Sequence, residues 1–562
     1  MKRVLSLLMS IFLITCGCSP AKRVARSYLR VEFSGDRRHG WTHFADMVST
    51  YPDPDTVMDA LDRALVDMDE SNDPKTLISV YEDQVEAYGK LVGATSLAYV
   101  RYCQNVTDAE KAEEYGRLNS SLYAIQIRLA RLEKALMDRW GYHLERGKEY
   151  AEALDRISDQ EDAVLRSLRG REDELCRRYE SLESEFQIKY QGRTWTMTEL
   201  MQDEDMTLQS FLEALERYET EKNQAAGEIY LELLSLRSQM ARESGYVTYA
   251  ESQYSAFGRE YSPKQALVAA QIVKQVFVPL YIRLRERCEN DLRYLCGASF
   301  SEDQFMAAME QAAERAVPGA GEAWRYMLAL GLYDSQPSKQ KLQGSFTTYL
   351  STYRCPFLFT QWEDDASSVF TVIHEFGHFL SYYTNPEGTY YAPEELDLAE
   401  TDAQGFELLM LSQYDVLFGR YATAARLCWL MNALYAILSG FMEDEFQQRA
   451  YGLKHPTVEE LNRLYGDLSK EYGFDRLFGY EGREWTEIGH TFQFPFYYVS
   501  YGVSMLGAMA LVRDGNRGYR RSLKRKAGAS FTEVVGRDVL AAETICELAA
   551  WIEKTANDLL QG

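Results

Sequence analysis

The strongest constraint on the fold is a long run of helical periodicity in the first half of the chain. Residues 109–187 contain no proline and few glycines, and apolar side chains recur there every three or four positions. The stripe comprises Leu118, Leu122, Ile125, Leu129, Leu132 and Leu136. Such spacing gives each helix one apolar stripe and favours antiparallel, coiled-coil-like packing. Because the 562 residues include only 13 prolines and 36 glycines, we predict a mostly α-helical protein.

Charge and cysteine content exclude some classes of function. Asp and Glu number 85 against 61 Lys and Arg, which gives a net charge of −24. A nucleic-acid binder needs a basic face to displace counterions, so we expect no nucleic-acid partner. Beyond the pair Cys16 and Cys18, none of the nine cysteines has the close spacing of a cysteine metal site.

The N-terminus has the features of a secretion signal. Two basic residues precede an apolar run over residues 4–14, which is too short to span a membrane as a stable helix. The cysteines that follow resemble the lipid-attachment box of bacterial lipoproteins, with Cys18 or Cys16 as the lipidated residue. The alternative is an ordinary cleaved signal peptide. We therefore expect residues 1–18 to direct export to the periplasm or cell surface, with membrane contact only through the lipid anchor.

The rest of the chain divides into predicted helices and one β-like segment. Residues 344–360 are rich in Thr, Tyr and Phe, which predicts a hairpin with an edge strand. Residues 191–193 break the helical pattern, and an aromatic- and glycine-rich stretch over residues 472–502 interrupts the C-terminal helices. The predicted helices are 197–215, 222–244, 263–296, 367–383 and 393–418.

The predicted helix 367–383 contains an HExxH motif, written HEFGH here. His374 and His378 are four residues apart, so both imidazoles lie on one helical face and can bind a single zinc ion. Glu375 lies next to them, where it can accept a proton from water at the metal. The alternative is a pair of partly buried helix histidines with a surface glutamate.

A catalytic zinc site also needs a third protein ligand, and the next helix offers one. Glu400 lies among small and apolar residues, where a carboxylate is costly unless it is paired or bound to metal. Glu407 lies two turns further along the same face and could accept a hydrogen bond from a ligand histidine. Both glutamates could instead face solvent.

A second polar constellation lies far downstream. His490, Tyr497, Tyr498 and Tyr501 fall within twelve residues, and Tyr498 and Tyr501 share a helical face. Phenol and imidazole donors can stabilise the oxyanion of a tetrahedral intermediate. The alternative is an aromatic core stripe, which the polar histidine makes less favoured.

Together these segments resemble the thimet oligopeptidase and oligoendopeptidase F family of zinc metallopeptidases, with the closest pattern in its Pz-peptidase-like branch. The matching segments, in order, are Gly344-Ser-Phe with CPFLFTQWEDD, then HEFGHFLSYY, AETDAQGFELL and GHTFQFPFYYVSY. A weaker similarity extends back to about residue 200 and includes LELLSLRSQMARESGYVTY. The resemblance therefore covers roughly the last two thirds of the chain.

The resemblance implies an elongated, multi-helical fold with two helical lobes around a deep channel and a small β edge near the zinc helix. It implies a helical lobe over residues 19–200 and a catalytic part over residues 201–562. One Zn²⁺ would be held by His374, His378 and Glu400, with Glu407 supporting them from behind.

The same resemblance assigns roles in hydrolysis of short, unstructured peptides. Glu375 would activate water, and Tyr498, assisted by His490 or Tyr501, would stabilise the oxyanion. Substrate would be held by Tyr497 and by the strand near Gly344, Ser345 and Phe346.

Three departures from the family pattern affect these expectations. One is the predicted secretion signal, because many members of the family are cytoplasmic. Asp402 stands where the Pz branch usually has histidine, which leaves the zinc ligands intact but changes the local hydrogen bonding. Glu363, Asp364 and Asp365 make the region after the strand acidic, which can alter the charge preference for substrate.

Three other readings of the sequence remain. They are a different HExxH-plus-Glu peptidase such as an aminopeptidase, a non-catalytic lipoprotein that binds peptides with this fold, and a helical scaffold with a chance motif. The ordered matches argue against the scaffold.

Overall fold

The computed structural model describes residues 39–70, 73–144, 151, 154, 163–203, 205–386, 396–513, 515–526 and 528–561. The protein is 75% helical with two small sheets, so the predicted fold class is confirmed. The predicted signal over residues 1–18, with Cys16 and Cys18, lies outside the described residues.

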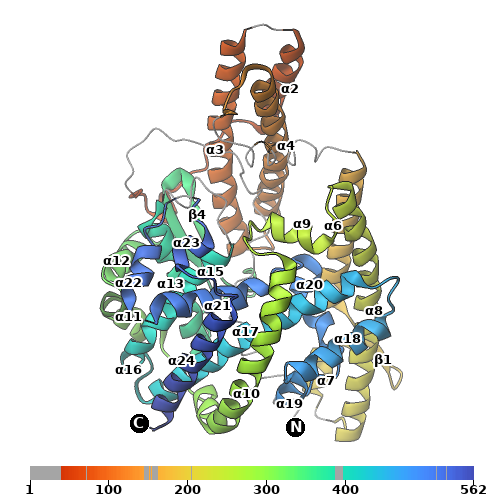
Figure 1. The fold of residues 1–562 in the computed structure, drawn as a ribbon, viewed down its shortest axis with the longest axis vertical. Helices are drawn as coiled ribbons and strands as arrows, with labels where there is room; N and C mark the ends of the chain where they lie inside the picture. The colour runs from red at the N-terminus through yellow and green to blue at the C-terminus, as the bar shows by residue number, and fades with distance from the viewer. Residues whose placement is uncertain are drawn as a thin grey trace.

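Three N-terminal helices pack together and project from the body of the molecule (Figure 1). They are α2 (Pro54–Glu70), α3 (Pro74–Gln104) and α4 (Ala109–Trp140). The six residues of the predicted stripe are buried on α4, as the period of three and four requires. This helix ends at Gly141, whose φ of 71° terminates the helix in the left-handed conformation that glycine tolerates.

Two further long helices run along another side of the molecule (Figure 1). These are α6 (Ala163–Glu185) and α8 (Leu208–Glu243), which pack against each other. Between them lie strands β1 (Ile188–Tyr190) and β2 (Arg193–Trp195) and the short helix α7 (Met197–Gln202). Gln191 and Gly192 have φ of 50° and 77°, as a tight two-residue hairpin turn requires, so the predicted break is a turn.

The predicted helices 197–215 and 222–244 are wrong in their boundary. α7 ends at Gln202, and α8 begins at Leu208 and continues without interruption to Glu243. Thr207 caps α8 by accepting a hydrogen bond from Ser210 N, while no proline or glycine lies between residues 208 and 226 to stop the helix.

Helices α9 (Tyr249–Ala256) and α10 (Pro263–Cys296) follow, and α10 has the predicted bounds. Ser262 and Gln265 form a capping box at its start, with Pro263 in the first turn. Helices α11 (Glu302–Ala316) and α12 (Ala320–Ala329) lead into the sheet.

A three-stranded sheet lies beside the HExxH helix and has the order β3-β5-β4. Its strands are β3 (Tyr333–Asp334), β4 (Phe346–Leu350) and β5 (Cys355–Phe359). β4 and β5 are antiparallel with Phe346 opposite Phe359, so the predicted hairpin is confirmed. Within the described residues β5 is the only strand that pairs with β4, which makes β4 an edge strand.

The two helices that carry the candidate ligands are α13 (Ala366–Thr384) and α15 (Leu396–Met410). They cross so closely that a Cβ on Gly377 would lie 2.6 Å from the Cα of Ala403. The middle of the HEFGH motif is therefore a point of backbone contact. The predicted single helix over residues 393–418 is wrong, because α15 ends at Met410 and a 3₁₀ turn separates it from α16 (Tyr414–Phe418). Arg426 binds the main-chain oxygen of Leu411 in that turn.

The C-terminal third packs around a long central helix, α17 (Ala422–Gly452). The remaining helices are α18 (Val458–Glu471), α19 (Phe474–Phe478), α20 (Gly489–Gln493), α21 (Val499–Val512), α22 (Asn516–Ser522), α23 (Phe531–Val535) and α24 (Ala542–Gln561). Where α17 meets α21, a Cβ on Gly440 would lie 2.9 Å from the main-chain oxygen of Tyr498. Small residues at this crossing bring the aromatic segment close to the centre of the protein.

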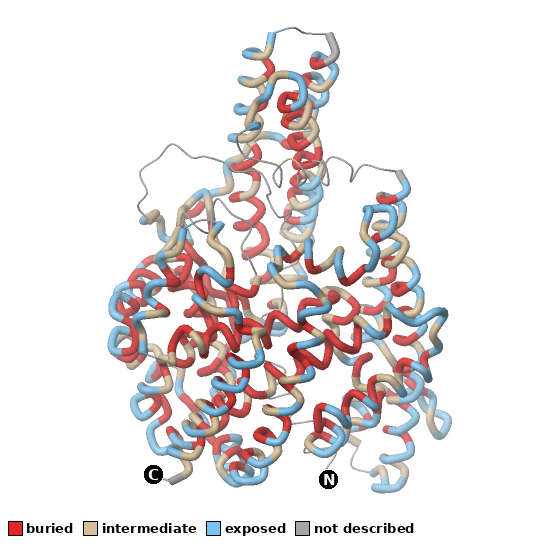
Figure 2. Tube along the Cα trace, viewed as in Figure 1, coloured by how far each residue is buried: buried red, intermediate tan, exposed pale blue. Residues whose placement is uncertain are grey.

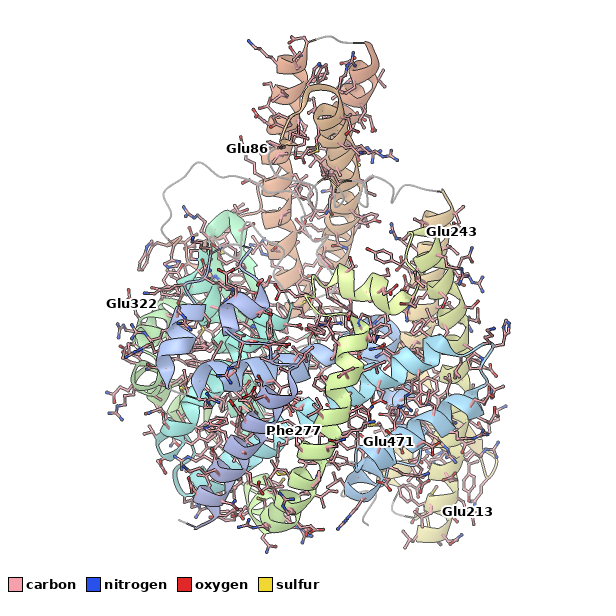
Figure 3. All side chains as sticks on the ribbon, in the orientation of Figure 1. Glu86, Glu213, Glu243, Phe277, Glu322 and Glu471 are labelled. Carbon is pink, nitrogen blue, oxygen red and sulfur yellow. The ribbon has the colours of Figure 1, made fainter. Side chains whose placement is uncertain are left out.

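One hydrophobic core extends from the N-terminal bundle to α24 (Figure 2). Phe277 is completely buried in it, while the five labelled glutamates in Figure 3 lie at the surface, consistent with the acidic composition. Residues 263–296 and 396–452 are long and apolar enough to cross a membrane, but 83% of the apolar window in the second is buried inside the protein. The domain boundary near residue 200 stays a prediction.

Candidate metal centre

His374 and His378 project from one face of α13 and are both buried. Asp365 caps this helix by accepting a hydrogen bond from Ser368 N at 2.9 Å. The spacing of four residues places the rings next to each other, with centroids 5.0 Å apart. The predicted arrangement of the HExxH histidines is thus present in the fold.

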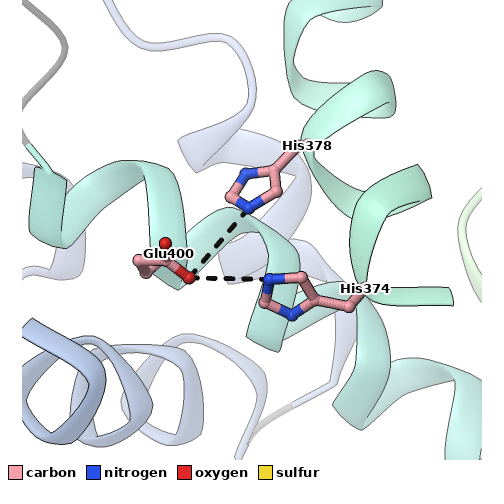
Figure 4. Close-up of side chains that lie close together, drawn as sticks. All are labelled: His374, His378 and Glu400. Carbon is pink, nitrogen blue, oxygen red and sulfur yellow. Dashed lines mark ion pairs between the residues drawn. The ribbon is translucent and has the colours of Figure 1, made fainter. Parts of the chain in front are cut away.

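Glu400 reaches the same point from α15 (Figure 4). Its Oε2 lies 3.6 Å from Nε2 of His374 and 4.0 Å from Nε2 of His378. The residue is 2% exposed, and this oxygen accepts no hydrogen bond from any described residue. A buried carboxylate oxygen facing two imidazole nitrogens without a hydrogen-bond donor fits a metal ligand set, since His₂Glu is a common ligand set of catalytic zinc.

Glu407 lies behind His374, as the sequence predicts. Its Oε1 is 2.5 Å from Nδ1 of His374, and its Oε2 accepts a hydrogen bond from Nε1 of Trp429 at 2.5 Å. A carboxylate on Nδ1 fixes the imidazole tautomer that presents Nε2 to a metal. Trp429 in turn fixes the carboxylate.

The charges at this centre favour a cation. Burial lowers the pKa of His374, but the hydrogen bond to Glu407 and the nearby carboxylates raise it to about 9. Burial and the neighbouring His374 lower the pKa of His378, and burial raises the pKa of Glu400 to about 7. The carboxylates around His374 thus favour its protonated, positively charged form when no metal is bound. A bound metal ion would take the place of that proton.

Glu375 is buried and held by the edge strand. Oγ1 of Thr347 on β4 donates to Oε2 of Glu375 and also lies 2.9 Å from its main-chain oxygen. The carboxylate beside the ligand histidines is therefore oriented by the same strand that was predicted to hold substrate.

The His-Tyr segment packs against this centre. The hydroxyl of Tyr497 donates to Oε1 of Glu400 at 3.2 Å. The centroid of the His490 ring lies 5.3 Å from that of Tyr497, 5.1 Å from that of Tyr498 and 6.1 Å from that of Tyr501. The downstream constellation and the HExxH helix α13, more than a hundred residues apart in sequence, are thus brought together at one place in the fold.

Burial also sets the protonation of this segment. It lowers the pKa of His490 to about 4 and, together with Tyr435 and Glu443, raises the pKa of Tyr498 far above its usual value. The imidazole is therefore neutral and the phenol keeps its proton at neutral pH. Nε2 of His490 is buried and has no hydrogen-bond partner among the described residues.

The predicted substrate residues lie along the sheet. Phe346 is buried and begins β4, Oγ of Ser345 is 2.8 Å from Oγ1 of Thr360, and Gly344 has a φ of 109° that only glycine adopts readily. Their role in substrate binding stays a prediction, as does that of Tyr497.

Asp402 is accommodated by partners of its own. Its Oδ2 accepts hydrogen bonds from Ser381 and, at 2.7 Å, from Arg525. The altered hydrogen bonding expected at Asp402 is therefore an ion pair with Arg525, which follows the C-terminal end of α22. In the acidic stretch 363–365, Asp365 is the helix cap described above.

Sequence reasoning missed Thr347 and Trp429. Thr347 is one of several threonines in a β-like run, and Trp429 is one of several apolar residues in a long helix. Neither carries a motif. The only sequence indication was for Thr347: side chains alternate along a strand, so Thr347 and Tyr349 are expected on the same face.

Comparison with known proteins places this site in context. No family model matches the chain. Oligopeptidase PepF of Bacillus subtilis (strain 168) is 28% identical over 270 residues, which are 42% of this chain and 39% of that protein. The match thus spans about two fifths of the relative's length.

Solved structures match along nearly the whole chain. A structure assigned as an oligoendopeptidase F is 20% identical with a TM-score of 0.73 and covers 93% of this chain and 100% of its own. Pz peptidase A, solved with an inhibitor, is 18% identical with a TM-score of 0.71 and covers 92% and 99%. An oligoendopeptidase-F from Enterococcus faecium is 14% identical with a TM-score of 0.58 and covers 90% and 98%.

These likenesses define the fold as that of the oligopeptidase F and Pz-peptidase structures. Together with the distant curated relative, they confirm the resemblance to this metallopeptidase family predicted from the sequence.

Proposed function

We propose that the protein is a zinc-dependent endopeptidase that hydrolyses short, unstructured peptides. The observation that carries this proposal is the convergence of His374, His378 and Glu400 at one buried point, with Glu375 beside them. The names of the similar proteins, oligopeptidase PepF and Pz peptidase A, support a peptide substrate.

The metal would be held by Nε2 of His374, Nε2 of His378 and Oε2 of Glu400. When bound, Zn²⁺ supplies a Lewis acid that polarises a peptide carbonyl and acidifies water. Glu407 holds the tautomer of His374 that this requires.

Glu375 then acts as the general base. Its carboxylate accepts the proton of the attacking water and donates it to the leaving amine, so one group serves both steps. Thr347 keeps the carboxylate beside the ligand histidines through its hydrogen bond to Oε2.

Tyr498 donates a hydrogen bond to the developing oxyanion, assisted by the neighbouring His490 or Tyr501. A phenol that stays protonated in a buried setting can donate without being reorganised at the moment of reaction. Main chain of β4 would pair with the substrate by β-augmentation, which tolerates many side-chain sequences. A narrow channel between the helical lobes would admit short peptides and exclude folded proteins.

The test is cleavage of an internally quenched peptide with both termini blocked. We expect cleavage by the zinc-loaded protein, loss of cleavage on chelation, and recovery with added Zn²⁺. Glu375→Gln should retain about one zinc per chain and lose at least about 10³-fold in kcat, as removal of a general base does. An aminopeptidase would leave the blocked peptide intact, and a binding protein would cleave nothing.

We also propose that residues 1–18 direct export and that Cys18 or Cys16 carries lipid. The support is the sequence pattern alone. A mass spectrum of the mature protein from a bacterial membrane fraction should show a diacylglyceryl cysteine at the N-terminus. An unmodified mature N-terminus would overturn the anchor.

A further inference from the structure

A buried polar cluster around Arg259 lies outside the groups used above. Arg259 follows α9, and 1% of its side chain is exposed. Its Nη2 donates to the main-chain oxygen of Phe496 and to Oγ of Ser500, both at 2.7 Å. Its Nε lies 3.9 Å from Oδ1 of Asp397, which is fully buried in the first turn of α15. The guanidinium thus joins α15, three residues before Glu400, to the segment that carries the tyrosines.

Phe496 is the residue in that segment that most needs support. Its φ of 63° lies in the left-handed region, which is unfavourable for a bulky side chain. Its N–H donates to Oε1 of Gln447 at 2.8 Å, and its carbonyl accepts from Arg259. Two buried side chains therefore hold both polar groups of a strained residue, which is how such strain persists at functional sites.

The conformation at Phe496 sets the direction of the next two residues. Tyr497 places its hydroxyl 3.2 Å from Oε1 of Glu400, and Tyr498 lies against the ring of His490. A relaxed, negative φ at Phe496 would rotate the chain at this point, moving the Tyr497 hydroxyl away from Glu400 and the Tyr498 ring away from His490.

The stability of the fold does not by itself explain why a buried arginine stands at position 259. Its Nε and Nη1 are buried and make no hydrogen bond to any described residue. The guanidinium packs over Tyr254 at 4.5 Å and Phe257 at 4.8 Å, and the hydroxyl of Tyr261 satisfies Oδ2 of Asp397. Replacing both partners of a buried ion pair by apolar side chains of similar size is often neutral or stabilising, so the Arg259–Asp397 pair is not explained by stability alone. The contacts to the Phe496 segment are therefore its distinctive contribution.

We propose that Arg259 is a positioning residue that fixes the Phe496 peptide and thereby holds Tyr497 at Glu400 and Tyr498 against His490. The inference rests on the proposed function, because it takes Tyr498 as the donor to the oxyanion.

The test compares Arg259→Met with Lys274→Met in zinc-loaded protein. Lys274 is a largely buried cation, with 10% of its side chain exposed, that pairs with Glu445 and Glu471, so its loss controls for removal of a paired cation. We expect Arg259→Met to lower kcat about 10- to 100-fold with KM changed less than about threefold, because misplacing a transition-state donor acts on kcat. Lys274→Met should leave both within about threefold.

A double-mutant cycle with Tyr498→Phe asks whether Arg259 acts through that phenol. In the Tyr498→Phe background, Arg259→Met should lower kcat by less than about threefold, because the two residues act as one unit. Full additivity would overturn the proposal. Arg259→Lys, which keeps the charge near Asp397 but shortens the bridge to Phe496, should lie between wild type and Arg259→Met.

Hydrogen exchange gives a readout that does not depend on activity. Arg259→Met should speed amide exchange over residues 496–501 at unchanged zinc content, whereas Lys274→Met should not. Unchanged exchange there would overturn the inference. A wild-type protein that cleaves no peptide would instead overturn the proposed function, and the exchange data would still decide whether Arg259 holds the segment.

Discussion

Individual side chains at the metal centre are each oriented by a partner from elsewhere in the chain. Glu407 orients His374 and is itself held by Trp429 on α17. Glu375 is held by Thr347 on the edge strand, and Glu400 by Tyr497. These hydrogen bonds orient His374, Glu375 and Glu400 within the fold itself, as preorganised electrostatic catalysis would require.

Tyr498 gives the first residue-scale prediction. Tyr498→Phe removes the phenol donor but keeps the aromatic ring, so we expect kcat to fall about 10²-fold while KM changes little, as for other oxyanion donors. Steady-state kinetics on a quenched peptide measure both constants. Tyr435→Phe, on the neighbouring α17, is the matched control and should retain most of kcat. If Tyr498→Phe raised only KM, Tyr498 would be a binding residue.

Glu443 gives a prediction about pH and stability. This buried carboxyl accepts a hydrogen bond from Tyr465 at 2.6 Å, and burial raises its pKa from 4.5 to about 8. Between these values the unfolded chain loses the proton and the folded protein keeps it. Stability should therefore fall as pH rises through this window, by up to about 1.4 kcal/mol per pH unit from this group.

Glu443→Gln removes this titration and keeps an acceptor for Tyr465. Urea denaturation at pH 5, 6, 7 and 8 should show a shallower decline for the variant than for wild type. The difference between the two slopes isolates Glu443 from the other titrating groups, and equal slopes would contradict the assignment.

At the scale of elements, the site depends on how closely two helices cross. α13 and α15 carry all three candidate ligands and meet at Gly377 and Ala403. The glycine in HEFGH is needed because a main-chain atom of the partner helix occupies the space of a Cβ. The aromatic segment is brought in by a similar close crossing of α17 and α21 at Gly440 and Gly502.

The variant Gly377→Ala tests this crossing. The added methyl would lie 2.6 Å from the Cα of Ala403, so the helices must separate and the histidines move away from Glu400. We expect stability to fall by about 1–3 kcal/mol and zinc to bind more weakly.

Gly116→Ala in α4 is the control, because nothing lies within 4 Å of its Cβ. It should be neutral or slightly stabilising, since alanine favours helix by up to about 1 kcal/mol. Chemical denaturation and competition with a zinc chelator measure both effects, and equal behaviour of the two variants would contradict the close crossing.

At the scale of the whole molecule, one core joins the projecting bundle, the sheet and the C-terminal helices. The candidate metal centre lies within this core and draws on α13, α15, the segment before α21 that carries Tyr497, and the edge strand β4. Occupancy of the centre should therefore stabilise the whole fold.

Chelation tests that coupling. A ligand that binds only the folded state at 1,000 times its Kd stabilises by about 4 kcal/mol, so zinc removal should lower Tm by several degrees. Calorimetry with and without a chelator, followed by added Zn²⁺, measures the shift. Glu400→Ala should unfold at the same temperature in both conditions, and a wild-type Tm insensitive to zinc would contradict a bound ion.

The sequence by itself determined the helical class, the bounds of α10, the hairpin at residues 344–360 and the pairing of His374 with His378. Each of these is a local property, because periodicity, caps and i,i+4 spacing are read within a few turns. It also marked Glu400 and Glu407 as acids on one helical face.

Only the tertiary structure decided which distant groups meet. Thr347, Trp429 and Arg259 carry no motif. They meet Glu375, Glu407 and Phe496 only because β4, α17 and the α9–α10 connection pack beside those residues. The end of α15 at Met410 was likewise set by packing, since Arg426 binds the main-chain oxygen of Leu411 in the turn that follows. A sequence period shows which face of an element is buried, but the partner on that face is chosen by contacts between residues far apart in the chain.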